Sequence, residues 1–189
     1  MTSPHRSRLC RHGLLASAAA AGVLVACAAV PVAPARAQPS AAGETLPQER
    51  ALPLALAVEI ARAAVETCGR QGAAVAATVV DRSGVLRVAL RADRAGPHTA
   101  EESRAKAYTA LSLRNSTGAL AAALDGGGAP GRAGRALAGL PGFLLHGGGV
   151  PIVAGDEVIG GLGVGGSGSG EADEACAEAA LRSVRDRLR

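Results

Sequence analysis

LPGFLLHGGGVPIVAGDEVIGGLGVGG, residues 140–166, is the stretch that decides the fold of this chain. Its two apolar runs predict two short strands joined by a tight turn at Gly155-Asp156. A Gly/Ser-rich turn over 167–170 follows, and then a last helix from about Glu171 to Leu188. The C-terminal part of the fold is therefore expected to be a strand hairpin followed by a helix.

Upstream of this hairpin, hydrophobic periodicity and turn residues predict six elements and a loop. In order, they are a helix over 52–67, a strand over 73–81, a turn at 82–84, a returning strand over 85–91, a helix over 99–114 with Thr99 and Glu102 as a capping box, a short helix over 115–125 and a loop over 126–135. This order lacks the strict β-α-β alternation of a doubly wound sheet. It predicts a single α+β domain over 50–189, with an antiparallel sheet and flanking helices.

The N-terminus has the pattern of a secretory signal. Three arginines precede an apolar run from Leu14 to Val30, and Ala35-Arg36-Ala37 forms a small-x-small cleavage motif. We therefore expect a signal peptide over 1–37, a disordered lead over 38–49 and a secreted or extracytoplasmic protein.

A lipid anchor is the alternative to free secretion. Leu24-Val25-Ala26-Cys27 matches the lipobox of bacterial lipoproteins, in which Cys27 would be lipidated and become the first residue. The sequence leaves both interpretations open.

Charge argues against nucleic acid as a partner. Four of the 20 Lys and Arg residues precede the expected cleavage site, so the remaining 16 balance the 16 Asp and Glu residues. The basic character of the whole chain therefore belongs to the precursor, and the mature protein has no basic excess to attract nucleic acid.

Two cysteines remain after cleavage, Cys68 and Cys176. In an exported chain an isolated pair is a disulfide candidate. The first and last helices of the expected fold pack near each other, which would bring these two residues together. Two free, buried cysteines are the alternative.

Glycine motifs and catalytic patterns give little sign of an enzyme. Two overlapping matches to G-x-G-x-x-G begin at Gly161 and Gly163, but no second parallel strand follows to complete a dinucleotide site. Close backbone packing within the strand explains these glycines better. G-x-S-x-G, C-x-x-C, H-x-x-x-H and EF-hand patterns are absent from the sequence, so we expect no catalytic or clustered metal site.

Several motifs in order resemble the GlcG/HbpS family of small haem-binding domains. They are VVDRSG (79–84), RADRAGPHT (91–99), KAYTA (106–110), NST (115–117) and the stretch 140–166. The similarity covers about residues 50–188 and is nearest to secreted, actinobacterial-type HbpS proteins. It implies a profilin-like α+β domain that assembles into homo-oligomers.

The resemblance also implies a function. We expect an exported haem-binding protein that acts in haem capture or in redox or haem sensing, with a membrane sensor protein as a candidate partner. The alternatives are an accessory or enzyme-associated domain that handles a corrinoid or a small 2-hydroxy acid, and a purely structural oligomeric module.

The expected haem contacts lie mainly in residues 95–110. They are His98 as candidate iron ligand, Lys106 as a propionate partner, and Tyr108 and Thr109 in the motif that the resembling haem binders use. His98 follows a Gly-Pro loop just before a helix, where it would alternatively only shield the helix end. His146 and a cysteine thiolate are further candidates, whereas the mature chain has no methionine to bind iron.

Overall fold

The computed structural model describes residues 48–126 and 128–189. The expected signal peptide, Cys27 and nearly all of the expected lead lie outside these residues. The elements are α1 (Leu54–Arg70), β1 (Ala76–Asp81), β2 (Leu86–Arg91), α2 (Thr99–Leu113), α3 (Thr117–Asp125), α4 (Gly128–Ala138), β3 (Gly149–Ala154), β4 (Glu157–Gly165), α5 (Gly170–Ser183) and the 3-10 turn η1 (Arg185–Arg187).

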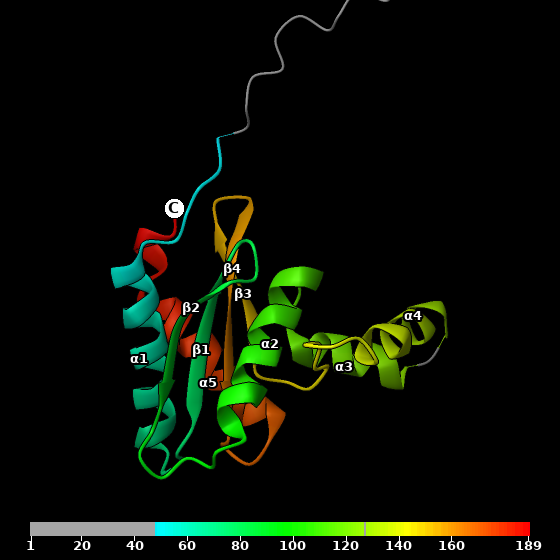
Figure 1. The fold of residues 1–189 in the computed structure, drawn as a ribbon, viewed down its shortest axis with the longest axis horizontal. Helices are drawn as coiled ribbons and strands as arrows, with labels where there is room; N and C mark the ends of the chain where they lie inside the picture. The colour runs from blue at the N-terminus through cyan, green and yellow to red at the C-terminus, as the bar shows by residue number, and fades with distance from the viewer. Residues whose placement is uncertain (1–47, 127) are drawn as a thin grey trace, which may run out of the picture. The chain divides into compact units, whose positions relative to one another are not determined.

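The four strands form one antiparallel sheet in the order β2-β1-β4-β3, with helices on both faces (Figure 1). Helices α1 and α5 cover one face, and α2 covers the other. The expected α+β class, the antiparallel sheet and the strand hairpin around Gly155-Asp156 are all confirmed. Within the described residues, no helix combines the length and the apolar character needed to cross a bilayer.

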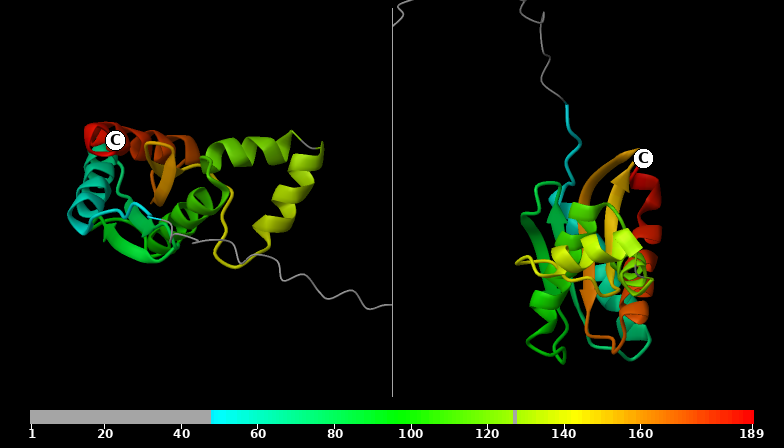
Figure 2. Two further views of the ribbon diagram at one scale, coloured as in Figure 1. Left: turned by 90° about the horizontal axis from the view of Figure 1, so that it is seen from above. Right: turned by 90° about the vertical axis from the view of Figure 1, so that its right-hand side faces the viewer.

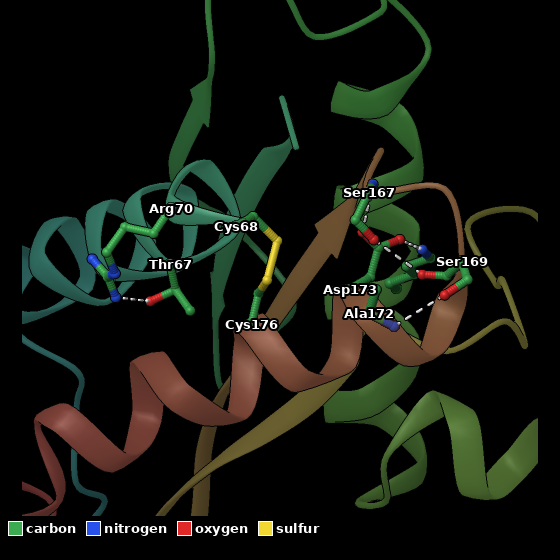
Figure 3. Close-up of a disulfide and its surroundings, with 9 residues drawn as sticks. Thr67, Cys68, Arg70, Ser167, Ser169, Ala172, Asp173 and Cys176 are labelled. Carbon is green, nitrogen blue, oxygen red and sulfur yellow. Dashed lines mark hydrogen bonds and ion pairs between the residues drawn. A yellow bond between two sulfur atoms is a disulfide. The ribbon is translucent and has the colours of Figure 1, made fainter. Parts of the chain in front are cut away.

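The α1/α5 face of the sheet is packed with aliphatic side chains. Alternate residues of β4, Leu162 and Val164, are buried here against the two helices. Cys68 of α1 and Cys176 of α5 are also buried here, and their sulfur atoms are joined in a disulfide with a Cα–Cα distance of 5.7 Å (Figure 3). The first and last helices do pack together, as the sequence predicts.

On the side of β4 that faces α2, the residues are glycines. A β-carbon at Gly161 would lie 2.2 Å from the carbonyl oxygen of Ala107, and one at Gly163 would lie 2.0 Å from that of Ser103. No larger residue fits while α2 keeps this distance from the strand. These glycines therefore allow close backbone packing between β4 and α2, as the sequence predicts.

The segment expected to be a loop over 126–135 is instead largely helical, because α4 spans Gly128–Ala138. Alanine and arginine are strong helix formers there, and Pro130 falls in the first turn, where a missing N–H is tolerated. The glycines then allow a close approach to α3: a β-carbon at Gly131 would lie 3.1 Å from the carbonyl oxygen of Leu124. Helices α3 and α4 form a hairpin that projects from the sheet (Figures 1 and 2).

Two helix ends differ from expectation. The capping box at Thr99 and Glu102 is wrong, since the Thr99 hydroxyl donates to the carbonyl of Gly96 (2.7 Å) and the Glu102 carboxylate binds Lys106 instead. Helix α5 ends at Ser183 and not near Leu188 as expected. The chain continues as the 3-10 turn η1, and Val184 between the two is buried in the core.

Candidate functional site

Two histidines that are distant in the sequence line one small cavity of about 230 Å³. His98 comes from the loop before α2, and His146 from the segment between α4 and β3. The remaining lining residues are Glu102, Gly166, Gly168, Ser169 and Asp173. We call this space the histidine cavity.

The His98 ring lies over Gly96, two residues earlier. A β-carbon at Gly96 would lie 2.7 Å from Cε1 of His98, so this ring position depends on the glycine. Both imidazoles belong to exposed residues and are accessible from solvent. An accessible imidazole can bind a metal or a haem iron through a ring nitrogen.

A buried ion network supports the histidine cavity. The Lys106 ammonium lies 2.8 Å from Oδ2 of Asp173 and 2.6 Å from Oε1 of Glu102, and the Lys106 and Asp173 side chains are 0% and 2% exposed. The other Asp173 oxygen accepts a hydrogen bond from the Ser167 backbone N–H (2.9 Å; Figure 3). The network thus ties α2 to the start of α5, the two elements that flank the cavity. It occupies the Lys106 ammonium, so we no longer assign this residue to a haem propionate.

A larger recess of about 840 Å³ adjoins the histidine cavity, and His146, Gly168 and Ser169 line both. This acidic recess lies between α3 and α5. Its four carboxylate side chains are those of Asp125, Glu171, Glu174 and Glu178. Among the described residues that line it there is no lysine or arginine. Its wall therefore attracts cations and repels anions.

Thr109 and Tyr108 lie away from the histidine cavity. The Thr109 hydroxyl is buried, donates to the carbonyl of Ala105 (2.8 Å) and accepts from the Leu144 N–H (2.8 Å). Tyr108 packs edge-on against Phe143, with ring centroids 5.4 Å apart, and lines a separate cavity. At about 100° per residue, Tyr108 points to the side of α2 opposite Lys106, while Thr109 shares the face of Lys106 but lies nearly one turn further along the helix.

The disulfide and the ion network change the list of candidate ligands. Cys68 and Cys176 are bonded to each other, so neither offers a thiolate. The role of Asp173 cannot be predicted from the sequence, because no local pattern indicates that an acidic residue 67 positions away pairs with Lys106. The described residues contain no group of three or more His, Cys, Asp or Glu side chains arranged to hold a metal ion.

Comparisons with known proteins agree on one family. The family model described as "Haem degrading protein HbpS-like" matches residues 52–182. The crystal structure of a Streptomyces reticuli HbpS double mutant is 38% identical, with a TM-score of 0.68, over 80% of this chain and 99% of that one. Protein ORFY of Klebsiella pneumoniae is 31% identical, with a TM-score of 0.67, over 76% and 96% of the two chains.

A third solved structure, a complex of PduOC with heme, is 30% identical, with a TM-score of 0.64, over 71% of this chain and 95% of that one. The curated proteins contain no significant match. The family model covers well over half of the sequence, and the fold agrees with the solved relatives. The chain therefore belongs to the HbpS-like family.

Proposed function

We propose that this protein binds haem, with His98 as the axial ligand of the iron and His146 at the same cavity. The observation that carries the proposal is the meeting of two accessible imidazoles in one cavity. The family description and the PduOC complex with heme support it, since both connect this fold with haem.

The residues present fit the donor chemistry of haem iron. After the expected cleavage, His98 and His146 are the last two histidines of the chain, no methionine remains, and both cysteines are in the disulfide. Two of the other five lining residues, Gly166 and Gly168, contribute no side chain to the cavity. When bound, haem would supply a redox-active iron, while the chain's own residues would hold and orient the group.

The biological setting is part of the same proposal. An exported haem binder would capture haem outside the cytoplasm or report haem and redox state to a membrane sensor protein. Free secretion and an anchor at Cys27 remain the two routes, and the protein acts as a homo-oligomer. A corrinoid or a small 2-hydroxy acid is the rival ligand.

Hemin titration of purified residues 38–189 tests the proposal. We expect a saturable Soret shift, weakened about tenfold or more by His98→Ala, equivalent to about 1.4 kcal/mol or more, and abolished in His98→Ala/His146→Ala. Tyr108→Phe is the matched control and should bind hemin like the wild type. Binding no stronger than that of an unrelated protein, or full binding by the double variant, would contradict the proposal. Displacement of hemin by cobalamin would favour the corrinoid alternative.

A further inference from the structure

The α3–α4 hairpin is too small to be stable through its own contacts. Its helices have 9 and 11 residues, whereas isolated helices shorter than about 12–15 residues are marginal in water. Thr117 is the one buried residue of α3, at its first position. The view from above shows the hairpin standing away from the sheet (Figure 2, left). Most of its surface is therefore left without a partner in this chain.

Helix α3 packs against α4 on one face and lines the acidic recess with the other. On one, α4 packs close to Leu124, since a β-carbon at Gly134 would lie 2.4 Å from Cδ2 of that side chain. The other face lines the acidic recess with residues at i, i+3, i+4 and i+7, namely Gly118, Ala121, Ala122 and Asp125. Three of these four residues are small, so a helix can approach this face closely.

Charge identifies what fits the recess. Its walls carry four carboxylates, and helix α4 carries Arg132 and Arg135 with no acidic residue. Both arginines are exposed, and Arg135 gives one hydrogen bond to the carbonyl of Leu124 (3.1 Å) within the hairpin. The molecule thus presents a basic projection and an acidic recess on the two sides of the same helix.

We propose that the α3–α4 hairpin of one copy docks into the acidic recess of a second copy. Because each copy has both parts, the exchange is reciprocal, as in a two-fold symmetric interface. The proposal commits to a second copy of this chain as the occupant. Docking covers the exposed hairpin and offsets part of the negative charge of the recess.

The same docking would complete the haem site, an extension that rests on the proposed function. A haem propionate is anionic, and the described residues that line the histidine cavity and the recess include no lysine or arginine, while the nearby Lys106 ammonium is buried between Glu102 and Asp173. His146 lies at the boundary of the two spaces. The partner subunit's Arg132 and Arg135 would bring to this boundary the positive charge that a single copy lacks.

Complementary charge reversal tests the docking. Arg132→Glu/Arg135→Glu reverses the charge of the hairpin. Asp125→Lys/Glu171→Lys/Glu178→Lys reverses the charge of the recess wall, which then has three lysines and one carboxylate, and it keeps Glu174, which accepts hydrogen bonds from the Gly118 and Gly148 N–H groups. Each variant alone should show at least a twofold loss of mass by light scattering at micromolar concentration. Mixed in equal amounts, the two variants should recover the wild-type assembly, because both contacts are again complementary. Arg62→Glu/Arg70→Glu on α1 is the control and should keep the wild-type mass.

The outcomes separate the interface from the haem site. Wild-type protein of single-chain mass, variants that stay assembled, or a mixture that does not recover would overturn the docking. If docking holds, Arg132→Glu/Arg135→Glu measured alone should bind hemin about tenfold or more weakly than the wild type, and the mixture of the two variants should bind hemin as tightly as the wild type. Equal hemin affinity in both would overturn the contribution of the partner's arginines. Absence of hemin binding in every sample, with normal assembly, would overturn the haem proposal alone.

Discussion

The helices on the two faces of the sheet are held to it by different kinds of interaction. On the α1/α5 face, aliphatic side chains and a disulfide fill the space between helices and strands. On the α2 face, glycines bring backbones into contact, and polar groups are buried, including Lys106, Asp173 and a Thr78–Ser103 hydroxyl pair 2.7 Å apart. The first face tolerates sequence change that conserves volume, while the second requires particular atoms in particular places.

This difference explains where the candidate site lies. Both histidines stand at the edge of the α2 face, beside the ion network that fixes α2 against α5. Buried ion pairs add little net stability compared with apolar packing, but they define geometry strictly, because a misplaced charge is costly. A rigid polar face is a suitable support for ligand-binding side chains, and the apolar face supplies the stability.

Removing the disulfide should give the largest effect and weaken only the apolar face. Cys68 and Cys176 are 108 residues apart, and the chain-entropy model assigns a loop of this size about 4–5 kcal/mol of stability, less any strain. Cys68→Ala/Cys176→Ala should lose that much free energy of unfolding in urea while its hemin affinity under folding conditions stays unchanged. Two free thiols, found by labelling the denatured, unreduced wild type, would contradict the prediction.

Lys106→Met should be the most damaging single change on the polar face. It leaves Asp173 buried without its partner, which typically costs about 3–5 kcal/mol. Replacing both residues, as in Lys106→Met/Asp173→Leu, should recover much of the loss because no lone charge remains. Glu102→Gln is the control and should cost less, since its side chain is 22% exposed. Chemical denaturation measures all three, and a double variant no better than Lys106→Met would refute the argument.

Local chemistry made most of the fold predictable. The four strands and the short helix α3 follow from periodicity and turn residues, which act over a few positions. The sequence does not predict helix α4, because its three glycines are typical of a loop, whereas Gly131 and Gly134 lie in close contact with α3. That contact belongs to tertiary packing, which overrides propensity.

The site was less predictable for the same reason. His98 was identified from its loop and lies in the histidine cavity, but its neighbours there come from α5 and from the segment before β3. Lys106, Tyr108 and Thr109 are close in the sequence, but α2 points Tyr108 to the opposite side from Lys106 and places Thr109 nearly one turn further along its axis. The resemblance indicated the segment, and only the structure assigns each side chain to its surroundings.

The two faces should respond in opposite ways to the same chemical change, glycine to alanine. Gly163→Ala on the polar face has no room for a methyl group and should cost about 1–3 kcal/mol or more. Gly69→Ala in α1 meets no atom within 4 Å and should stabilise the helix by about 0.5–1 kcal/mol. Urea denaturation of the two variants measures both changes in the free energy of unfolding. If Gly163→Ala left this free energy unchanged, α2 would be able to move away from the strand.

The smallest expected effect concerns charge on the apolar face, where ion pairs lie at the surface. Arg187 donates a hydrogen bond to the exposed Glu59 carboxylate of α1 and lowers the pKa of Glu59 below its ordinary value of 4.5; partial desolvation opposes this shift, and charge attraction adds to it. Because the pKa of Glu59 is lower in the folded state than in the unfolded state, the ion pair stabilises the protein fully at a pH above the ordinary pKa. The contribution disappears as the pH falls through the lowered pKa.

Glu59→Gln should therefore lower the melting temperature by about 1–3 °C at pH 7, because an exposed ion pair contributes little, and the difference should disappear as the pH falls through the lowered pKa of Glu59. Glu66→Gln, on the same helix and without an ion pair among the described residues, should show no such pH dependence. A difference that persists in acid would mean that Glu59 acts through packing and not through charge. Glu59 would then belong with the packing of the apolar face, which would make the contrast between the two faces sharper still.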